Sequence, residues 1–336
     1  MSSYQNIRLE KGMYGVAGQN FTQVLESLDP TEQYRGTELE RLDAYQRQLK
    51  RFDIKVGGRY SDQVSKFFAT TESSALFPEY VRRSVRKGLE EQNVVDQLVA
   101  VVTQIDSRDY RSITSNPSQE DKELMQVAEG AVIPATTVRT QDNLVRLHKR
   151  GRMLVAPYEV VQYQRLDLFA VTLNQIGAAI ATAHMRDAVD VLIHGDGNGN
   201  PAGTVAAGTP GTLEYGDLLR LWALFDPYEM NTLVASPDAV LQMAELAPFQ
   251  NPLTGLNFAG TGQMSTPLGA SLIKSRHLPE GAVIALDKNC ALEKVQCGDV
   301  SIEYDKLIDR QMERAAVTVT AGFAKIFADA VKVLTV

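Results

Sequence analysis

Apolar residues recur every three or four positions along residues 164–192, the longest helical pattern in the chain. The apolar positions that share one helix face are Leu166, Phe169, Leu173, Ile176 and Ile180. The polar positions are Asp167, Gln175, Arg186, Asp187 and Asp190. At about 1.5 Å per residue, this helix is about 40 Å long, more than one small core needs. The turn-forming sequence GDGNGNP at 195–201 ends it. We interpret this helix as a spine beside which the other elements are arranged.

Two shorter helices are predicted before the spine. Residues 37–52 have apolar residues at helical spacing, with Thr37 as N-cap and Glu40 as its capping-box partner. This helix packs either on its own domain or on a neighbouring copy, and the sequence leaves both open. The second helix is predicted to start at Pro78, because proline is best tolerated in the first turn of a helix.

The second helix carries a basic cluster, composed of Arg82, Arg83, Arg86 and Lys87. Such a cluster binds phosphate groups, forms a solvated face or makes salt bridges between subunits. No aromatic residues that could stack on bases are interleaved with it, which favours the solvated face or the salt bridges. We therefore consider Arg82, Arg83 and Arg86 as candidate intersubunit contacts.

A β-prone region lies between this helix and the spine. Residues 99–105 are β-rich, and residues 115–121 have turn composition. Residues 131–140 and 144–147 are predicted to pair as a hairpin, after which Lys149-Arg150-Gly151 bends the chain. The arm has few large apolar residues, so it would be marginally stable alone in water. At roughly 3.3 Å per residue it projects some 30 Å, and we expect its partner surface on another subunit.

The C-terminal half predicts alternating helices and strands. Residues 212–225 form a helix whose Trp222, the only tryptophan, is predicted to fill the core. Residues 232–235 form a strand, followed by a helix with Ser236 as N-cap and Pro237 in its first turn. Residues 249–266 form a long loop rich in Gly, Asn and Thr, and loops of this size are usually functional or contact-forming. Further strands are predicted in SLIK, AVIAL, VSIEY, RAAVTVTAGFAKIF and AVKVLTV.

Composition places the chain among ordinary globular proteins. It has 336 residues, 44% hydrophobic and 22% charged, enough for one large or two modest cores. Neither a membrane span nor a secretion signal is encoded, so we expect folding in a cytosol, with Cys290 and Cys297 as reduced thiols. The net charge of −7 argues against a protein that coats nucleic acid, although it permits loose enclosure of it.

No motif predicts a catalytic, cofactor or metal site. The glycines at 195, 197 and 199 follow a helix, whereas a dinucleotide fingerprint follows a strand. Pro201 stands where a calcium loop needs glycine, and residues 255–262 lack the Gly-Lys-Ser/Thr ending of a P-loop. The four histidines lack ligand spacing, and Asp187 with Asp190 suggests a solvated acidic face. We predict neither an enzyme nor a bound cofactor.

The order of these parts resembles the major capsid protein of tailed bacteriophages, with the Hong-Kong-ninety-seven-like capsid fold. The resemblance extends from about residue 76 to 336. It rests on KRGRMLVAPYEVV, the spine helix closing on HGDGNGNPAG, SPDAVLQMAEL with the following glycine-rich loop, PLGASLIKS, and VSIEY through the terminal strands. It implies an α+β fold with an N-terminal arm, an extended β-hairpin loop, a peripheral domain that holds the spine helix, and an axial domain.

The resemblance also implies a division of the chain. The expected parts are an N-terminal arm or extension at 1–75, the first part of the peripheral domain at 76–130, the extended hairpin loop at 131–156, the spine helix at 157–200, the axial domain at 201–298, and C-terminal peripheral strands at 299–336. Residues 1 to about 70 lie outside the best match and are expected to act as a long arm or a built-in scaffolding segment.

The implied function is that of a structural subunit of an icosahedral capsid. Copies would assemble into hexamers and pentamers that enclose double-stranded DNA without sequence specificity, in virions assembled in the host bacterial cytoplasm. Portal, scaffolding and decoration proteins are further implied partners, and no membrane is involved. The alternatives are the shell of an encapsulin-like compartment with the same fold and a soluble α/β enzyme.

Some members of the resembled family join neighbouring subunits through a lysine in the extended loop and an asparagine near the C-terminal strands. Lys149 is the only lysine of the predicted arm, but residues 301–336 contain no asparagine. This departure puts such a crosslink in doubt. We hypothesise instead that Lys149, Arg150 and Arg152 contact acidic residues of an adjacent subunit.

Overall fold

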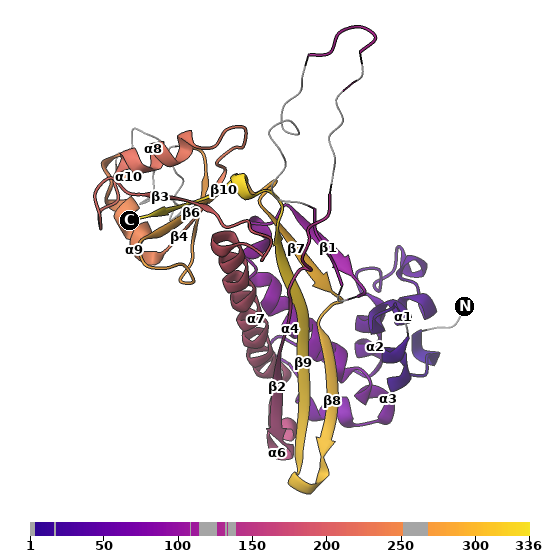
Figure 1. The fold of residues 1–336 in the computed structure, drawn as a ribbon. Coiled ribbons are helices and arrows are strands. Elements are labelled where there is room, and N and C mark those ends of the chain that lie inside the picture. Colours follow the sequence, from indigo (N-terminus) through magenta and orange to yellow (C-terminus); the bar gives the residue numbers. More distant parts are fainter. Residues whose placement is uncertain are drawn as a thin grey trace. The chain divides into compact units, whose positions relative to one another are not determined.

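The computed structural model describes residues 4–16, 18–107, 109–113, 126–131, 133, 139–250 and 268–336. The chain divides into two units, and Figure 1 shows the order of their elements. Unit 1 comprises residues 1–93, 150–181 and 300–319. Unit 2 comprises residues 94–149, 182–299 and 320–336.

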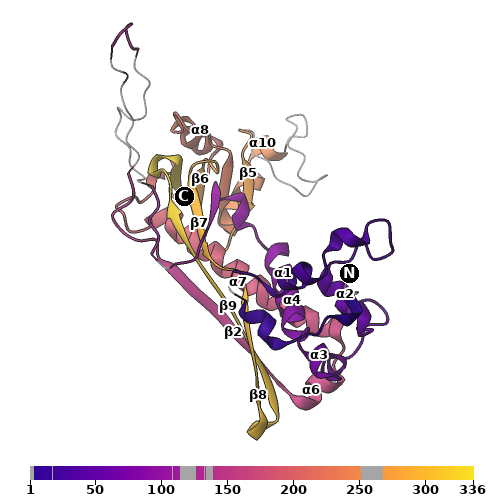
Figure 2. The same cartoon turned by 90° about the vertical axis from the view of Figure 1, so that its right-hand side faces the viewer.

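Unit 1 combines helices with the ends of long strands. Its helices are α1 (Phe21–Leu28), α2 (Ala44–Arg51), α3 (Thr71–Ser74), α4 (Phe77–Glu91), α6 (Tyr158–Tyr163) and the first part of α7 (Leu166–His194). Its strands are β8 (Ser301–Leu307) and parts of β2 (Leu147–Pro157) and β9 (Met312–Lys325). β8 pairs antiparallel with β9, in register from Ser301 with Thr318 to Leu307 with Met312, and Figure 2 shows the two strands side by side. The predictions of a spine helix and of a helix starting near Pro78 are confirmed.

The N-terminal residues are part of the core of unit 1. Phe21, Leu25, Tyr45 and Phe67 lie in the same buried cluster as apolar residues of α4, α7 and β9. Arg47 is also fully buried, and its Nε lies 2.6 Å from Oδ2 of the equally buried Asp29. The described residues of the predicted N-terminal arm or extension at 1–75 are therefore folded, and their apolar side chains help to complete this core.

Helix α2 begins later than predicted. Asp43, and not Thr37, caps it: the Asp43 carboxylate accepts a hydrogen bond from the Gln46 amide, and the Gln46 side chain accepts one from the Asp43 amide. Thr37 instead lies in a turn, where its hydroxyl donates to the Tyr34 carbonyl. Two capping-box patterns lie six residues apart in the sequence. The helix uses the second one, because a helix that begins at Ala44 buries Tyr45 and Leu49.

Helices α4 and α7 approach each other backbone to backbone. A Cβ atom on Gly88 would lie 2.1 Å from the Asn174 carbonyl oxygen, and one on Gly177 would lie 2.0 Å from the Val85 carbonyl oxygen. Only glycine fits at either position, because the obstructing atoms are backbone and cannot rotate away. This glycine pair sets the distance between the two helices that form the centre of unit 1.

We predict that Gly177→Ala lowers the free energy of unfolding by about 3 kcal/mol or more, because the added methyl group forces α4 and α7 apart. Gly216→Ala is the matched control: Gly216 is also helical, but open space surrounds the position of its Cβ. The control should stabilise by up to about 1 kcal/mol. Chemical denaturation measures both, and equal effects of the two substitutions would contradict the close helix contact.

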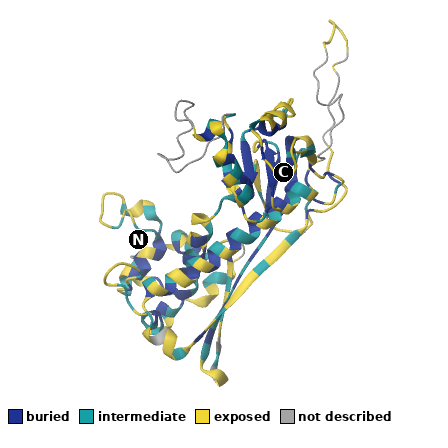
Figure 3. Cartoon of the chain, turned by 90° about the vertical axis from the view of Figure 1, so that its left-hand side faces the viewer, coloured by how far each residue is buried: buried dark blue, intermediate teal, exposed yellow. Residues whose placement is uncertain are grey.

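Unit 2 contains a five-stranded sheet covered on both faces. Its strand order is β3 (Gly203–Ala206), β10 (Val331–Thr335), β6 (Ala282–Leu286), β4 (Thr232–Ala235) and β5 (Ser271–Lys274). Alternate residues of β6 face opposite cores: Val283 and Ala285 face the helices α8 (Tyr215–Ala223), α9 (Pro237–Glu245) and α10 (Ala247–Gln250), while Ile284 faces the last turns of α7. Both faces are therefore buried, as the dark strands of Figure 3 show.

The remaining strands of unit 2 form a second set. β1 (Val101–Ile105) pairs parallel with β7 (Leu292–Cys297), which pairs antiparallel with the last residues of β9. All the strands predicted in the C-terminal half are present, so the α+β class is confirmed. Most of the long loop predicted at 249–266 lies outside the described residues, since only Phe249 and Gln250, both in α10, are described.

Two predictions about side chains in the α8 and α9 region are wrong. Trp222 is half-exposed instead of filling the core, because the sheet-facing side of α8 is already filled by Leu218 and Leu221. Ser236 makes no side-chain cap bond to α9, although Pro237 lies in the first turn as predicted.

The end of α7 is fixed by a buried polar cluster. Gly195, Gly197 and Gly199 all have positive φ, as expected for this turn. The Asp196 carboxylate accepts hydrogen bonds from the Lys325 amide at 2.9 Å and from the Gln141 side chain at 3.1 Å. These bonds compensate for burying a charged carboxylate.

Lys325 is fully buried in the same cluster. Its Nζ donates to the Leu192 carbonyl at 2.9 Å, which caps the C-terminal turn of α7 with a positive charge. Burial lowers the pKa of Lys325 to about 8, although the Asp196 carboxylate acts in the opposite direction. The folded protein therefore binds this proton less tightly than the unfolded chain does.

We predict that the Lys325 contribution to stability rises with pH between about 8 and the ordinary lysine value of 10.5. In this window the unfolded chain binds a proton that the folded chain has released, so the gain reaches up to about 3 kcal/mol. Lys325→Met should lack this gain, whereas the exposed control Lys288→Met should retain it. Denaturant unfolding at several pH values measures the difference, and parallel curves for wild type and Lys325→Met would contradict the prediction.

Candidate intersubunit surfaces

The strand β2 carries the three basic residues that we predicted to contact a neighbour. Lys149, Arg150 and Arg152 lie within one continuous strand, so the predicted bend at 149–151 is wrong. A Cβ atom on Gly151 would lie 2.7 Å from the Val317 carbonyl oxygen. Gly151 is therefore needed for close approach to β9 and not for a turn.

A bridge and two hydrogen bonds fix the chain before β2. Ile113 and Thr140 form an antiparallel bridge, and the amide of Gln141 donates to the Ser112 carbonyl. Asn143 then fastens the chain to the turn after α7, where its side chain donates to the Gly197 carbonyl at 2.8 Å. Residues 114–139 lie between the two bridged residues, and most of that segment, with the predicted strand at 131–140 and the turn at 115–121, lies outside the described residues. The extended loop at 131–156 therefore stays a prediction.

The alternation of side chains along β2 separates the basic residues. Lys149 shares a strand face with Met153 and Val155, all of them exposed. Arg150 and Arg152 share the other face with Leu154 and Ala156, which contact the core of unit 1. The three residues therefore do not form one basic patch: Lys149 lies among exposed apolar side chains, and Arg152, which is also exposed, lies on the other face of the strand.

Further exposed apolar residues follow in the helices after β2. In unit 1 they are Val160 and Tyr163 of α6 and Leu168 and Val171 of α7. Leu168 and Val171 lie three residues apart on the side of α7 opposite Leu166 and Leu173, which are buried. The periodicity that predicted the inner face of the spine did not single out this outer apolar face.

The basic cluster of α4 is largely used inside the subunit. The buried Glu79 carboxylate accepts from the Thr22 hydroxyl at 2.7 Å, from Arg82 Nε at 2.8 Å and from Arg83 Nε at 2.9 Å. Arg83 also bonds to Asp43 at 2.7 Å. Arg82 and Arg83 thus fasten α1 and α2 to α4 inside the subunit, and their contact with another subunit stays a prediction.

The two remaining cations of α4 are near its exposed end. Arg86 pairs with Glu90 at 2.7 Å and Lys87 with Glu91 at 3.7 Å, each one helical turn apart. Exposed pairs of this kind contribute little to stability. They line a hollow beside α1 with Asn20, and Arg86 remains a candidate for contact with another subunit.

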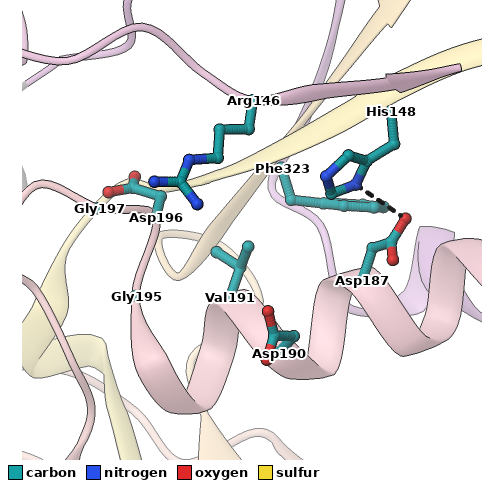
Figure 4. A pocket seen from close by; sticks show the side chains of 9 residues that line it. All are labelled: Arg146, His148, Asp187, Asp190, Val191, Gly195, Asp196, Gly197 and Phe323. Carbon is teal, nitrogen blue, oxygen red and sulfur yellow. Dashed lines mark hydrogen bonds and ion pairs between the residues drawn. The ribbon is translucent and has the colours of Figure 1, made fainter.

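A second hollow, of about 200 Å³, lies between the start of β2 and the last turns of α7. Figure 4 shows the Arg146 guanidinium group pointing towards Asp196 and Gly197. His148 Nδ1 lies 3.4 Å from Asp187 Oδ2, so Asp187 is paired and does not belong to a solvated face. The lining has no hydroxyl or thiol nucleophile, and the described residues contain no cluster suited to hold a metal ion. The residues that line this hollow connect the start of β2 with α7 within unit 2.

Both cysteines are free thiols, as predicted. Burial, followed by the neighbouring Asp287 carboxylate, raises the pKa of Cys290 to about 12. A thiol with such a raised pKa is a poor nucleophile at neutral pH, so Cys290 fits a structural position.

Helix α7 is the one helix among the described residues that is long and apolar enough to cross a membrane by length and composition alone. The core helix of a globular protein passes the same test. Here Leu173 and Ile176 lie in the core of unit 1, and Val189 and Leu192 in a core of unit 2. The apolar composition of α7 is thus explained by packing.

Comparison with solved structures identifies the fold. The capsid of an empty GTA particle, computed with C5 symmetry, matches with a TM-score of 0.53 and 15% identity over 73% of this chain and 89% of that chain. The native GTA particle gives a TM-score of 0.50 and 15% identity over 73% and 90%. The capsid of Cyanophage P-SCSP1u gives a TM-score of 0.50 and 13% identity over 72% and 88%. The chain therefore has the fold of tailed-phage capsid subunits.

The sequence identifies the family. The model of the phage capsid protein family matches residues 140–332, more than half of the chain, so the chain belongs to this family. A search of curated proteins finds no match. The resemblance found in the sequence is confirmed: the chain is a major capsid protein, its role is structural, and it is a component of a virion capsid.

Proposed function

We propose that this subunit builds an icosahedral shell of hexamers and pentamers that encloses double-stranded DNA in a phage virion assembled in the host bacterial cytoplasm. Portal, scaffolding and decoration proteins are its further partners. The observation that carries this proposal is the exposed apolar surface of unit 1 on β2, α6 and α7 in a member of the phage capsid family. Several exposed apolar side chains on consecutive elements favour contact with another protein.

We base the proposed division into domains on the two units. We assign unit 1 to the peripheral domain, including the folded residues 4–75, and the sheet β3-β10-β6-β4-β5 with its helices to the axial domain. Because β10 pairs with β6, we propose to place residues 331–335 with the axial domain instead of the peripheral strands. The N-terminal residues take part in a core, which argues against their acting as a removable scaffold.

Enclosure of DNA agrees with the charge of the chain. With a net charge of −7, the subunit repels phosphate overall, so DNA would be contained by the shell and not bound tightly to it. This arrangement needs no sequence-specific contacts.

We predict that the chain expressed alone forms ring-shaped capsomers or hollow particles, because the exposed surfaces of one copy are covered by other copies. Size-exclusion chromatography and electron microscopy measure this. A monomer that stays compact at high concentration would contradict the proposal. Nuclease-protected DNA in native particles distinguishes a virion from a compartment shell of the same fold.

We predict that Lys149→Glu lowers the yield of shells about ten-fold by placing like charges opposite acidic residues of the neighbour. The melting temperature of the isolated subunit should be unchanged, since Lys149 is exposed. The charge-conserving control Lys149→Arg should assemble normally. Shell yield and subunit melting are measured on the same preparations, and a normal yield for Lys149→Glu would remove Lys149 from the interface.

A further inference from the structure

The chain that leads into residues 114–139 is tied to β7 by a buried carboxylate. Glu293 of β7 is 4% exposed. Its carboxylate accepts hydrogen bonds from the Thr103 hydroxyl of β1, from the Tyr110 hydroxyl at 2.7 Å and from the Ser112 hydroxyl. Tyr110 and Ser112 follow β1 and lie outside any helix or strand, so regular backbone pairing does not hold them. Glu293 thus attaches irregular chain to the sheet.

The hydrogen bonds of Glu293 compensate for a buried charge. Among the described residues no cation is paired with Glu293, since the adjacent Lys294 lies on the other face of the strand and pairs with Asp96 at 3.6 Å. The three hydroxyl donors therefore offset the cost of burying the carboxylate. Apolar residues in place of such a network are often as stabilising or more so. This comparison favours a role of Glu293 in fixing the position of the chain over a role in stability.

The chain that leaves residues 114–139 is held by a second buried polar residue. Gln141 is 3% exposed, and its side-chain amide donates to the Asp196 carboxylate at 3.1 Å and to the Lys325 carbonyl at 3.2 Å. The side-chain oxygen of Gln141 accepts from the Asn198 side chain at 3.0 Å. All of these residues belong to unit 2. This end is therefore fixed to the turn after α7 and to the end of β9.

The two ends are also joined to each other. The Gln141 amide donates to the Ser112 carbonyl at 2.8 Å, and the Val145 amide donates to the Tyr110 carbonyl at 2.9 Å. The apolar core beside them is small, with three buried side chains: Val145, Val295 and Ala324. Apolar contacts are non-directional, so the hydrogen bonds determine how the two ends are oriented on unit 2.

We propose that Glu293 is a positioning residue, which fixes the direction in which residues 114–139 leave unit 2. The inference rests on the proposed assembly of the chain into closed shells. A ring closes only if every copy presents its contacts at the same angle. A segment that is tied to one unit at both ends keeps this angle, whereas release of one end permits many directions. Loss of the hydroxyl contacts to Glu293 therefore impairs closure more than it impairs folding.

A pair of matched double variants tests the contact. Tyr110→Phe with Ser112→Ala removes two donors from the chain and leaves the Glu293 carboxylate in place. The control, Tyr60→Phe with Ser301→Ala, removes the same two hydroxyl groups from exposed positions. Both variants keep the tyrosine ring, so they differ in whether a bond to Glu293 is lost.

Hydrogen exchange of the free subunit measures the attachment. The Val145 amide should exchange about ten-fold faster in the Tyr110–Ser112 variant than in the control, because its acceptor, the Tyr110 carbonyl, is held less firmly. The Asp287 amide, which donates to the Ala330 carbonyl at 3.0 Å elsewhere in unit 2, should exchange as in the wild type. Equal exchange of the Val145 amide in the variant and the control would overturn the inference.

Glu293→Gln is a milder variant, because it keeps the size of the side chain and one acceptor oxygen but removes the charge. The Val145 amide should exchange about three-fold faster than in the wild type. This variant decides alone if the Tyr110–Ser112 variant does not fold, and a wild-type exchange rate would then overturn the inference.

Assembly gives a second measurement, which separates positioning from stability. In the Tyr110–Ser112 variant the fraction of closed particles seen by electron microscopy should fall about ten-fold, while size-exclusion chromatography still shows associated subunits. The melting temperature of the free subunit should equal that of the control. Closed particles at the control yield would contradict the positioning role. A yield that falls only together with the melting temperature would show a stabilising role and would equally contradict it.

The two proposals fail in different ways. If electron microscopy of the wild type shows no capsomers or particles, the proposed function is wrong, and the role of Glu293 in assembly is wrong with it. If the wild type forms particles and the variants at Tyr110, Ser112 and Glu293 close them equally well, the shell is real and only the positioning role of Glu293 is wrong.

Discussion

The contact between Gly88 and Gly177 is the constraint on which the arrangement of unit 1 depends. It lets α4 and α7 touch through their backbones, at a cost of about 1 kcal/mol for each glycine inside a helix. The close pair then presents Phe77 and Tyr80 on one helix beside Phe169 on the other. The N-terminal helices complete this aromatic cluster. Helices as short as α1 and α2 are marginally stable alone, so packing against the α4–α7 pair determines their position.

Charges inside the subunit are used to fix its own segments. Arg47 with Asp29, Glu79 with Arg82 and Arg83, and Lys325 at the end of α7 are all buried or nearly so, and each is held by several hydrogen bonds. A buried pair of this kind adds specificity of position more reliably than it adds stability. The surface, in contrast, carries exposed apolar side chains: leucines, valines and aromatic residues are exposed on β2, α6, α7 and α8. Such a distribution is typical of a subunit that is completed by others.

The sequence predicted the elements whose signals are local. The spine helix, the proline in the first turn of α4 and the strands of the C-terminal half follow from periodicity and from single-residue preferences, and all are present. The wrong predictions fall at positions where a tertiary contact determines the local structure. Gly151 predicted a turn, but it allows the close approach of β9 to β2. Thr37 was predicted as the N-cap of α2, but Asp43 caps this helix.

The candidate surface was predicted less well than the fold, for a related reason. A basic cluster has the same appearance in the sequence whether its partners lie in the same chain or in a neighbour. Glu79, the partner of Arg82 and Arg83, lies on the same helix. Its burial depends on α1, and the periodicity of the sequence does not predict where α1 packs. Trp222 was assigned to the core because tryptophan is usually well buried, and no local pattern told which side of α8 faces the sheet. Exposed apolar positions therefore had to be read from the structure.

Exposed apolar side chains lie on both units, and this separation has consequences for assembly. Some lie on β2, α6 and α7, and others on α8 and α9. Substitutions at such separate sites, with no shared contacts, are expected to have additive effects. In the proposed shell each copy would contact its neighbours through several such surfaces, and contacts that are weak one by one would combine.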